Sequence, residues 1–238
     1  MEIVVRVLCV VIGYCFGMIQ TAFIYGKMHG IDIREHGSGN SGTTNALRVL
    51  GKKAGLIVLL GDFFKAGIMC ILARVIGTMF FPDILYPMIL WGGLGVVLGH
   101  NFPFYMNFKG GKGIAATAGV IFGTLDWRLW LICLLAFVIC VVITRYVSLG
   151  SLIVVTLLFA SFMFFGMTGN IINPVTDTPY AGTDLIECYI ILFLFGALAF
   201  ERHKANIGRL IRGEENKIFS KKPELQAQAE QGSNEQTE

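Results

Sequence analysis

Residues 127–167 read WRLWLICLLAFVICVVITRYVSLGSLIVVTLLFASFMFFGM, and this stretch decides the fold class. Between positions 129 and 167 the only charged residue is Arg145, which separates an apolar run at 127–143 from another at 146–167. A bilayer-spanning helix needs about 20 predominantly apolar residues, with a lower limit near 17. The stretch therefore predicts two membrane-spanning helices joined by a tight turn.

The rest of the 238-residue chain follows the same pattern. Hydrophobic residues make up 55% of it and charged residues 15%, against about 25% charged in soluble domains. Further apolar runs lie at 3–25, 54–81, 84–101, 112–124 and 185–200. The sequence predicts an all-α integral membrane protein with about seven transmembrane helices, one of them short. The short run, 112–124, either crosses the bilayer or enters it and returns as a half-helix.

The basic residues are distributed unevenly between the loops. If all seven runs cross, one side receives 15 of the 19 Lys and Arg residues, while the opposite loop at 168–184 has none. Positively charged loops stay in the cytoplasm, so we expect a cytoplasmic C-terminus and an N-terminus outside. We expect residues 1–216 to form a single membrane domain and 217–238 to be a polar, disordered cytoplasmic tail. The 15 residues are Lys27, Arg34, Arg48, Lys52, Lys53, Lys109, Lys112, Arg145, Arg202, Lys204, Arg209, Arg212, Lys217, Lys221 and Lys222.

Two glycine-rich segments on this face are candidate phosphate sites. GSGNSGTTN (Gly37–Asn45) suits either an anion-binding nest or a plain linker, and it is not a Walker A loop because Thr43 stands at the lysine position. FKGGKG (Phe108–Gly113) leads directly into the short helix, where backbone donors, the helix dipole and two lysines coincide. If this segment only anchored the chain at the cytoplasmic face, it would need the lysines but not the glycines.

A third polar segment, RHKANI (Arg202–Ile207), follows the last apolar run. His203 and Asn206 are one turn apart and can share a face, whereas the arginines nearby could equally bind anionic lipid headgroups. Within the second apolar run, Asp62 and Lys65 have i, i+3 spacing and predict a structural ion pair facing the bundle interior.

The sequence offers little support for metal or disulfide chemistry. The four histidines form no HxxxH or HxxE set, and none of the six cysteines has CxxC spacing. No metal and no cofactor are therefore expected. The polar segments together predict a site for phosphorylated substrates beside lipid.

Four motifs in order carry a resemblance to a known family. GSGNSGTTNALRVLG (from Gly37), GHNFPFYMNFKGGKGIA (from Gly99), TRYVSLGS (from Thr144) and RHKANIGRLIRGEE (from Arg202) are similar to the successive motifs of the bacterial acyl-phosphate:glycerol-3-phosphate acyltransferases, the PlsY family. The resemblance covers about residues 1–216. Gly208 departs from the family pattern, where a charged residue is common.

The resemblance implies transfer of a fatty acyl group from acyl phosphate to the sn-1 hydroxyl of glycerol 3-phosphate. The products would be lysophosphatidic acid and phosphate, formed at the cytoplasmic face of a bacterial inner membrane, without metal, nucleic acid or an obligate protein partner. By the resemblance, the residues that hold glycerol 3-phosphate are Ser38, Arg48, Lys112, His203 and Asn206. Acyl phosphate would be bound by Gly110, Gly111 and Gly113, with Lys109 nearby. Further candidates for substrate binding are Asn45, Thr43 and Ser148, and Glu215 is structural.

A transporter or exchanger of organic phosphates is the competing interpretation. It would use the same basic loops as a gate, and it predicts polar groups near the middle of the membrane and a second access route outside. The polar segments instead collect on one face, and the opposite loops carry no basic residue, so the sequence favours the acyltransferase.

Overall fold

The computed structural model describes residues 1–124 and 126–218. Within these ranges the structure is helical apart from one bridge between Ile172 and Pro179, which confirms the all-α prediction. Of the predicted tail at 217–238, all but Lys217 and Ile218 lie outside the described residues. The α-helices are α1 (Glu2–Gly17), α2 (Thr21–Met28), α3 (Thr43–Leu50), α4 (Lys52–Phe80), α5 (Leu85–Asn101), α6 (Ile114–Gly123), α7 (Trp127–Thr144), α8 (Val147–Met167), α9 (Gly182–Arg202) and α10 (Lys204–Ile211).

Six helical segments of the described chain are long and apolar enough to cross a membrane, counting α1 with α2 as one. The shorter apolar helix α6 is a seventh, so the predicted set of about seven segments with one short member is confirmed. α6 has 10 residues and rises about 15 Å, half the roughly 30 Å of a hydrocarbon core. As a single helix it is therefore shorter than the hydrocarbon core is thick.

The first apolar run is broken, although the sequence predicts one continuous span over 3–25. α1 ends at Gly17 and α2 begins at Thr21, because Gln20 has a non-helical backbone with φ −94° and ψ 89°. The buried Gln20 amide donates to the carbonyls of Gly99 and His100, at 3.4 and 3.0 Å. These carbonyls belong to the last turn of α5, where backbone acceptors lack helical partners. The break thus lets one side chain cap the neighbouring helix.

α1 and α5 meet along a seam of glycines. Gly13 and Gly17 on α1 face Gly95 and Gly99 on α5, and a Cβ atom at any of the four would overlap a backbone carbonyl of the other helix. Small residues four apart let two helices approach closely, which replaces the hydrophobic driving force that is missing between helices in lipid. The seam fixes the end of α5 next to the break between α1 and α2.

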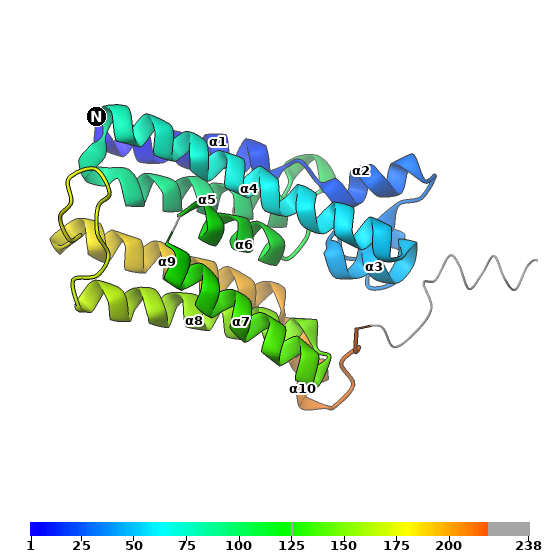
Figure 1. Cartoon of the computed structure of the whole chain (residues 1–238). Helices are drawn as coiled ribbons and strands as arrows, with labels where there is room; N and C mark the ends of the chain where they lie inside the picture. The colour runs from blue at the N-terminus through cyan, green and yellow to red at the C-terminus, as the bar shows by residue number, and fades with distance from the viewer. Residues whose placement is uncertain (125, 219–238) are drawn as a thin grey trace, which may run out of the picture.

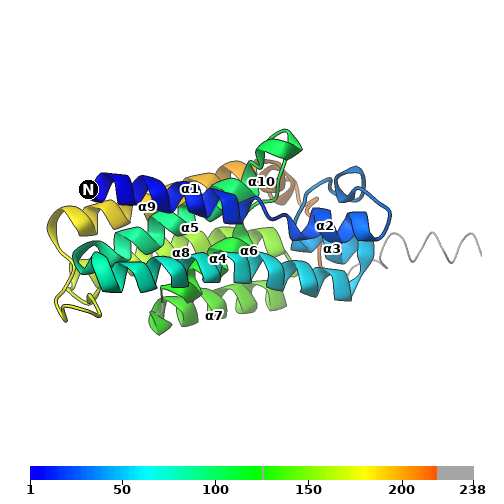
Figure 2. The same cartoon turned by 90° about the horizontal axis from the view of Figure 1, so that it is seen from above.

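The helices form two layers with α6 between them. α1, α4 and α5 lie on one side and α7, α8 and α9 on the other, and α5 packs against α9 across the middle (Figure 1). The N-terminus lies at one end of the bundle, and α2 and α3 lie at the opposite end (Figure 2). We call this opposite end, where the starts of α3, α6, α8 and α10 also gather, the site end.

Candidate active site

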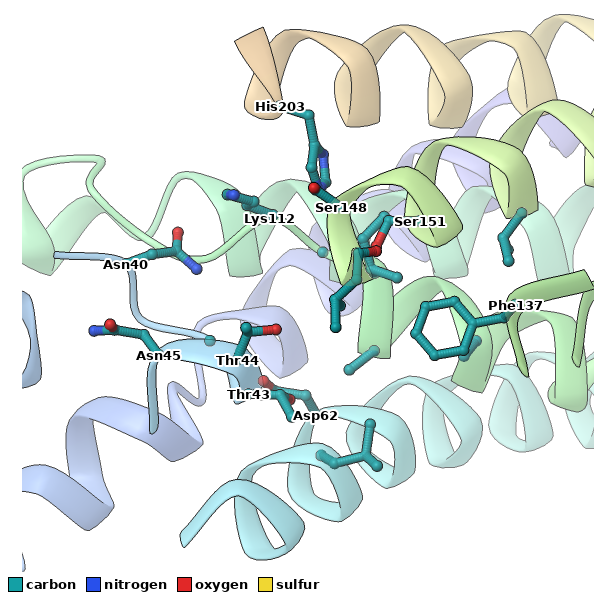
Figure 3. A pocket seen from close by; sticks show the side chains of 18 of the residues that line it. Asn40, Thr43, Thr44, Asn45, Asp62, Lys112, Phe137, Ser148, Ser151 and His203 are labelled. Atoms are coloured by element: carbon teal, nitrogen blue, oxygen red, sulfur yellow. The ribbon is translucent and has the colours of Figure 1, made fainter. Parts of the chain in front are cut away.

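A cavity of about 420 Å³ lies at the site end, between the loop before α3 and helices α3, α4, α6, α7, α8 and α10. It brings together residues from all four sequence motifs. In Figure 3, His203, Lys112 and Ser148 lie on one side of the cavity and Thr43 and Thr44 on the other. The predicted site residues that border it are Ser38, Thr43, Asn45, Arg48, Asp62, Lys112, Gly113, Ser148, His203, Asn206 and Glu215.

Asn45 organises the loop before α3. Its side-chain nitrogen donates to the carbonyls of Ile33 and His36, at 3.1 and 3.0 Å. Its Oδ1 atom accepts hydrogen bonds from the backbone amide and the hydroxyl of Ser38, at 2.8 and 3.1 Å. The buried side chain therefore fixes where Ser38 stands at the cavity wall. The nearby Thr43 hydroxyl is buried without a hydrogen-bond partner among the described residues.

Glu215 ties α10 to α8 and orients the side chains at the cavity rim. Its Oε1 accepts from Asn206 Nδ2 at 2.8 Å and from the Ser148 hydroxyl at 3.2 Å, and its Oε2 accepts from Arg209 Nε at 2.7 Å. Asn206 in turn accepts a hydrogen bond from the Lys112 ammonium. One carboxylate thus sets the positions of a hydroxyl, an amide and, through the amide, a lysine.

His203 is buried at the start of α10, and its Nδ1 lies 2.7 Å from the carbonyl of Ala199. A carbonyl only accepts, so Nδ1 carries the proton and Nε2 is left as an acceptor. Burial, and next the charge of Lys112, lower the pKa of His203 to about 4. The imidazole is therefore neutral at pH 7 and can accept a hydrogen bond from a substrate hydroxyl.

The rim of the cavity has an excess of positive charge. Burial, and the nearby Arg209, Arg202 and Arg48, lower the pKa of Lys112 to about 8, while Glu215 acts in the opposite direction. Burial likewise lowers the pKa of Arg48. Cations crowded around one carboxylate are stabilised by an incoming anion, so the arrangement favours binding of a phosphate group.

The Gly110–Gly113 loop, whose glycines are predicted to bind a phosphate, uses two of its backbone amides within the fold. The amide of Gly110 donates to the carbonyl of Asn101 at 3.1 Å, and that of Gly111 donates to the carbonyl of His100 at 3.0 Å. Both amides cap the last turn of α5, and neither glycine borders the cavity. Arg202 holds the loop from the other side by donating to the carbonyls of Gly110 and Gly111. Of the predicted loop residues, only Lys112 and Gly113 face the cavity.

Two other predicted residues lie apart from the cavity. Lys109 is exposed, and Lys65 is buried behind the cavity wall, where its ammonium lies 2.8 Å from the Asp62 carboxylate in the predicted ion pair. The sequence left Arg209 open between binding lipid headgroups and a place in the site, and it gave His100 no role; both border the cavity. The one available signal for His100 was its place at the polar end of an apolar run.

The deeper part of the cavity is apolar. Trp130, Leu134 and Phe137 of α7 face Ile121 of α6 and Val154 of α8, and Figure 3 shows Phe137 on the side away from Asn40 and Asn45. A hydrocarbon chain could lie there while its polar end remains at the cationic rim. Among the described residues, no group of three His, Cys, Asp or Glu side chains could hold a metal ion.

Comparison with known proteins agrees with this geometry. The model of the family described as glycerol-3-phosphate acyltransferase matches residues 7–213. The glycerol-3-phosphate acyltransferase of Clostridioides difficile is 38% identical, covering 93% of this chain and all of the relative. The enzyme of the same name from Thermosipho melanesiensis is 39% identical over 87% of this chain and 89% of its own.

Solved structures match equally well. A crystal structure of PlsY, an integral membrane glycerol 3-phosphate acyltransferase, in its glycerol 3-phosphate form is 33% identical, with a TM-score of 0.71 over 90% of this chain and 95% of that one. The lysophosphatidic acid form of PlsY gives 32% identity and a TM-score of 0.69. These matches support an acyltransferase and give no support to a transporter. The chain therefore belongs to the glycerol-3-phosphate acyltransferase family of integral membrane enzymes.

Proposed function

We propose that this membrane acyltransferase transfers a fatty acyl group from acyl phosphate to the sn-1 hydroxyl of glycerol 3-phosphate, releasing lysophosphatidic acid and phosphate. The observation that carries the proposal is a single cavity with a cationic, hydroxyl-lined rim and an apolar interior. Such a cavity suits one small phosphorylated substrate and one phosphorylated lipid. The PlsY structures that resemble this chain are of its glycerol 3-phosphate and lysophosphatidic acid forms.

In this proposal, Arg48 and Lys112 bind the phosphate of glycerol 3-phosphate, with Ser38 beside them. Neutral His203 accepts a hydrogen bond from the glycerol, and Asn206 orients Lys112. Glu215 has a structural role because it holds Asn206 and Ser148 from one carboxylate. These side chains position the substrate, since holding two reactants in attack geometry can supply roughly 7–11 kcal/mol in the best cases.

The acyl phosphate headgroup would lie between Thr43, Ser148 and Gly113. The Thr43 hydroxyl, which has no partner among the described residues, can donate to a phosphate oxygen, and Gly113 directly precedes the first turn of α6, where backbone amides lack helical acceptors. For Lys109, Gly110 and Gly111, a contribution to acyl phosphate binding remains a prediction from the family resemblance only. The amides of Gly110 and Gly111 cap α5 in this conformation. The acyl chain would occupy the apolar part between α6, α7 and α8.

The chemistry then needs few side chains. The sn-1 hydroxyl oxygen attacks the acyl carbon, the bond from that carbon to the phosphate oxygen breaks, and a phosphate oxygen takes the hydroxyl proton. Phosphate is a good leaving group in this mixed anhydride, so acid assistance is less important. The cations stabilise charge that develops on the carbonyl and phosphate oxygens. His203 positions the hydroxyl and is not an obligatory base.

We further propose that the site end faces the cytoplasm of a bacterial inner membrane, with the N-terminus outside. The uneven distribution of basic residues supports this orientation, because 15 of the 19 Lys and Arg residues belong to the segments assigned to that side. Residues 1–216 would act as one membrane domain, with no cofactor and no obligate protein partner.

The test uses purified protein in detergent or lipid cubic phase, with palmitoyl phosphate and glycerol 3-phosphate but no added metal. Phosphate release and lysophosphatidate are followed together, and palmitoyl-CoA replaces the donor in a parallel reaction. Equal amounts of both products, with none from palmitoyl-CoA, are expected. Turnover from palmitoyl-CoA alone would refute the donor assignment, and folded protein without any turnover would refute the proposed reaction.

A further inference from the structure

Three ionisable side chains lie together at the wall of the cavity, and the proposed chemistry uses none of them; Asp62 and His100 border the cavity and Lys65 lies behind them. Asp62 and Lys65 on α4 and His100 on α5 are each at most 5% exposed. Burying such groups costs several kcal/mol for each ion, and apolar residues of similar volume often give equal or greater stability. A polar cluster at this depth therefore calls for a role beyond stability.

The hydrogen bonds of the cluster fix the orientation of His100. The Lys65 ammonium donates to Asp62 Oδ1 at 2.8 Å and to the carbonyl of Ile19 at 2.7 Å, and it lies 2.9 Å from His100 Nδ1. An ammonium group only donates, so Nδ1 is the acceptor and the ring proton is on Nε2. Thr21 donates to the same Asp62 oxygen at 3.2 Å. The imidazole is thus held by a lysine whose three donor positions are all occupied.

The other edge of the ring supports the Gly110–Gly113 loop. A Cβ atom at Gly111 would overlap Nε2 and Cε1 of His100, so the ring lies directly against the Gly111 backbone. The backbone carbonyl of His100 accepts a hydrogen bond from the Gly111 amide. On the opposite side of the loop, Arg202 donates a hydrogen bond to the Gly111 carbonyl. Gly111 is therefore fixed between His100 and Arg202.

Lys112 follows Gly111 directly and reaches Asn206 at the cavity rim. A shift of the Gly111 backbone would move the Lys112 ammonium with it, because no other residue separates them. We infer that His100, held by Lys65 and Asp62, is a positioning residue that sets the location of Lys112 for catalysis. This inference rests on the proposed function, in which Lys112 binds the substrate phosphate.

A double-mutant cycle on kcat/KM tests the inference, because a residue that acts through Lys112 loses its effect once Lys112 is gone. His100→Ala should lower kcat/KM for glycerol 3-phosphate by about 100-fold, the loss expected for a misplacement near 1 Å. In a Lys112→Met background, the same change should lower kcat/KM by less than about threefold. A larger further loss, including undetectable turnover, would show that His100 acts independently and overturn the inference.

Arg6→Met is the matched control, because it removes a partly buried ion pair at the opposite end of the bundle, where Arg6 Nε lies 2.6 Å from Glu187. It should lower the melting temperature in detergent while changing kcat/KM by less than about twofold in both backgrounds. A strong effect of Arg6→Met on kcat/KM would mean that any lost ion pair impairs the enzyme, which would also overturn the inference.

A second variant guards against a folding defect in His100→Ala. Lys65→Met keeps the methylene chain and removes the ammonium, and it should show the same pattern across the two backgrounds. If neither variant can be purified folded, the cluster is needed for folding and the positioning role is refuted. Wild-type activity in Lys112→Met alone would instead refute the proposed substrate site, which distinguishes the two failures.

Discussion

The Gly37–Gly42 loop and the Gly110–Gly113 loop are both glycine-rich, yet their backbones are used differently. In the first loop, a buried side chain satisfies the backbone: Asn45 binds the amide of Ser38 and two carbonyls, and the loop borders the cavity. In the second loop, the backbone amides of Gly110 and Gly111 cap α5, and both glycines are buried away from the cavity.

The difference shows that a glycine-rich loop at the site end can indicate two distinct things. In the Gly37–Gly42 loop they accompany polar side chains that line a binding site. In the Gly110–Gly113 loop they allow close packing, so that a single lysine is delivered to the site from a rigid base. We therefore expect an added side chain to be harmful in the Gly110–Gly113 loop, where the backbone packs closely, and to be tolerated better in the Gly37–Gly42 loop.

The largest expected loss comes from Arg48, the cation on α3 six residues beyond the first loop. Arg48→Ala should lower kcat/KM with a cost of about 3 kcal/mol, or more than 100-fold, comparable to loss of one oxyanion-hole donor. Steady-state assays with glycerol 3-phosphate and palmitoyl phosphate measure it. The exposed Lys53 on α4 provides the control, Lys53→Ala, which should retain full activity. Full activity in Arg48→Ala would remove Arg48 from the site.

Gly111→Ala should come next, although Gly111 does not border the cavity. Its new Cβ would overlap the His100 imidazole, which is buried and cannot move aside easily. The loop must then shift and carry Lys112 with it, so kcat/KM should fall by up to about 100-fold. If thermal melting shows that the variant is folded and its kcat/KM is normal, the loop is not a rigid base for Lys112.

Much of this arrangement could be predicted from the sequence, and the exceptions have a common physical origin. The apolar runs predicted the helices, and the i, i+3 spacing predicted the Asp62–Lys65 pair, because both depend on local periodicity. The break at Gln20 and the capping role of Gly110 depend on where the end of α5 lies. That position follows from packing between segments distant in sequence, so no local pattern could indicate it.

The pH dependence distinguishes Lys112 from His203. With a pKa of about 8, Lys112 is mostly charged at pH 7 and loses its charge as pH rises, so phosphate binding should weaken above pH 8. The KM for glycerol 3-phosphate should rise by at most about tenfold for each pH unit there. His203, with a pKa of about 4, should add no change between pH 7 and pH 9.

The variant Lys112→Arg tests this assignment, because a guanidinium remains charged across the range and should abolish the rise in KM. Measurements should begin at pH 7, above the second pKa of a phosphate monoester near 6. A rise in KM that persists unchanged in Lys112→Arg would assign the titration to another group.

The smallest effect should come from Gly42→Ala in the first loop. Gly42 has φ −142°, an extended conformation that alanine adopts readily, and its Cβ would meet only the side-chain amide of partly exposed Asn40 at 2.8 Å. That amide can rotate away, so kcat/KM should change by less than about threefold. Both variants replace a glycine with alanine in a glycine-rich loop. A difference in kcat/KM between Gly42→Ala and Gly111→Ala therefore reports on close backbone packing. If Gly42→Ala were as damaging as Gly111→Ala, the first loop would also depend on close backbone approach, and the contrast between the loops would fail.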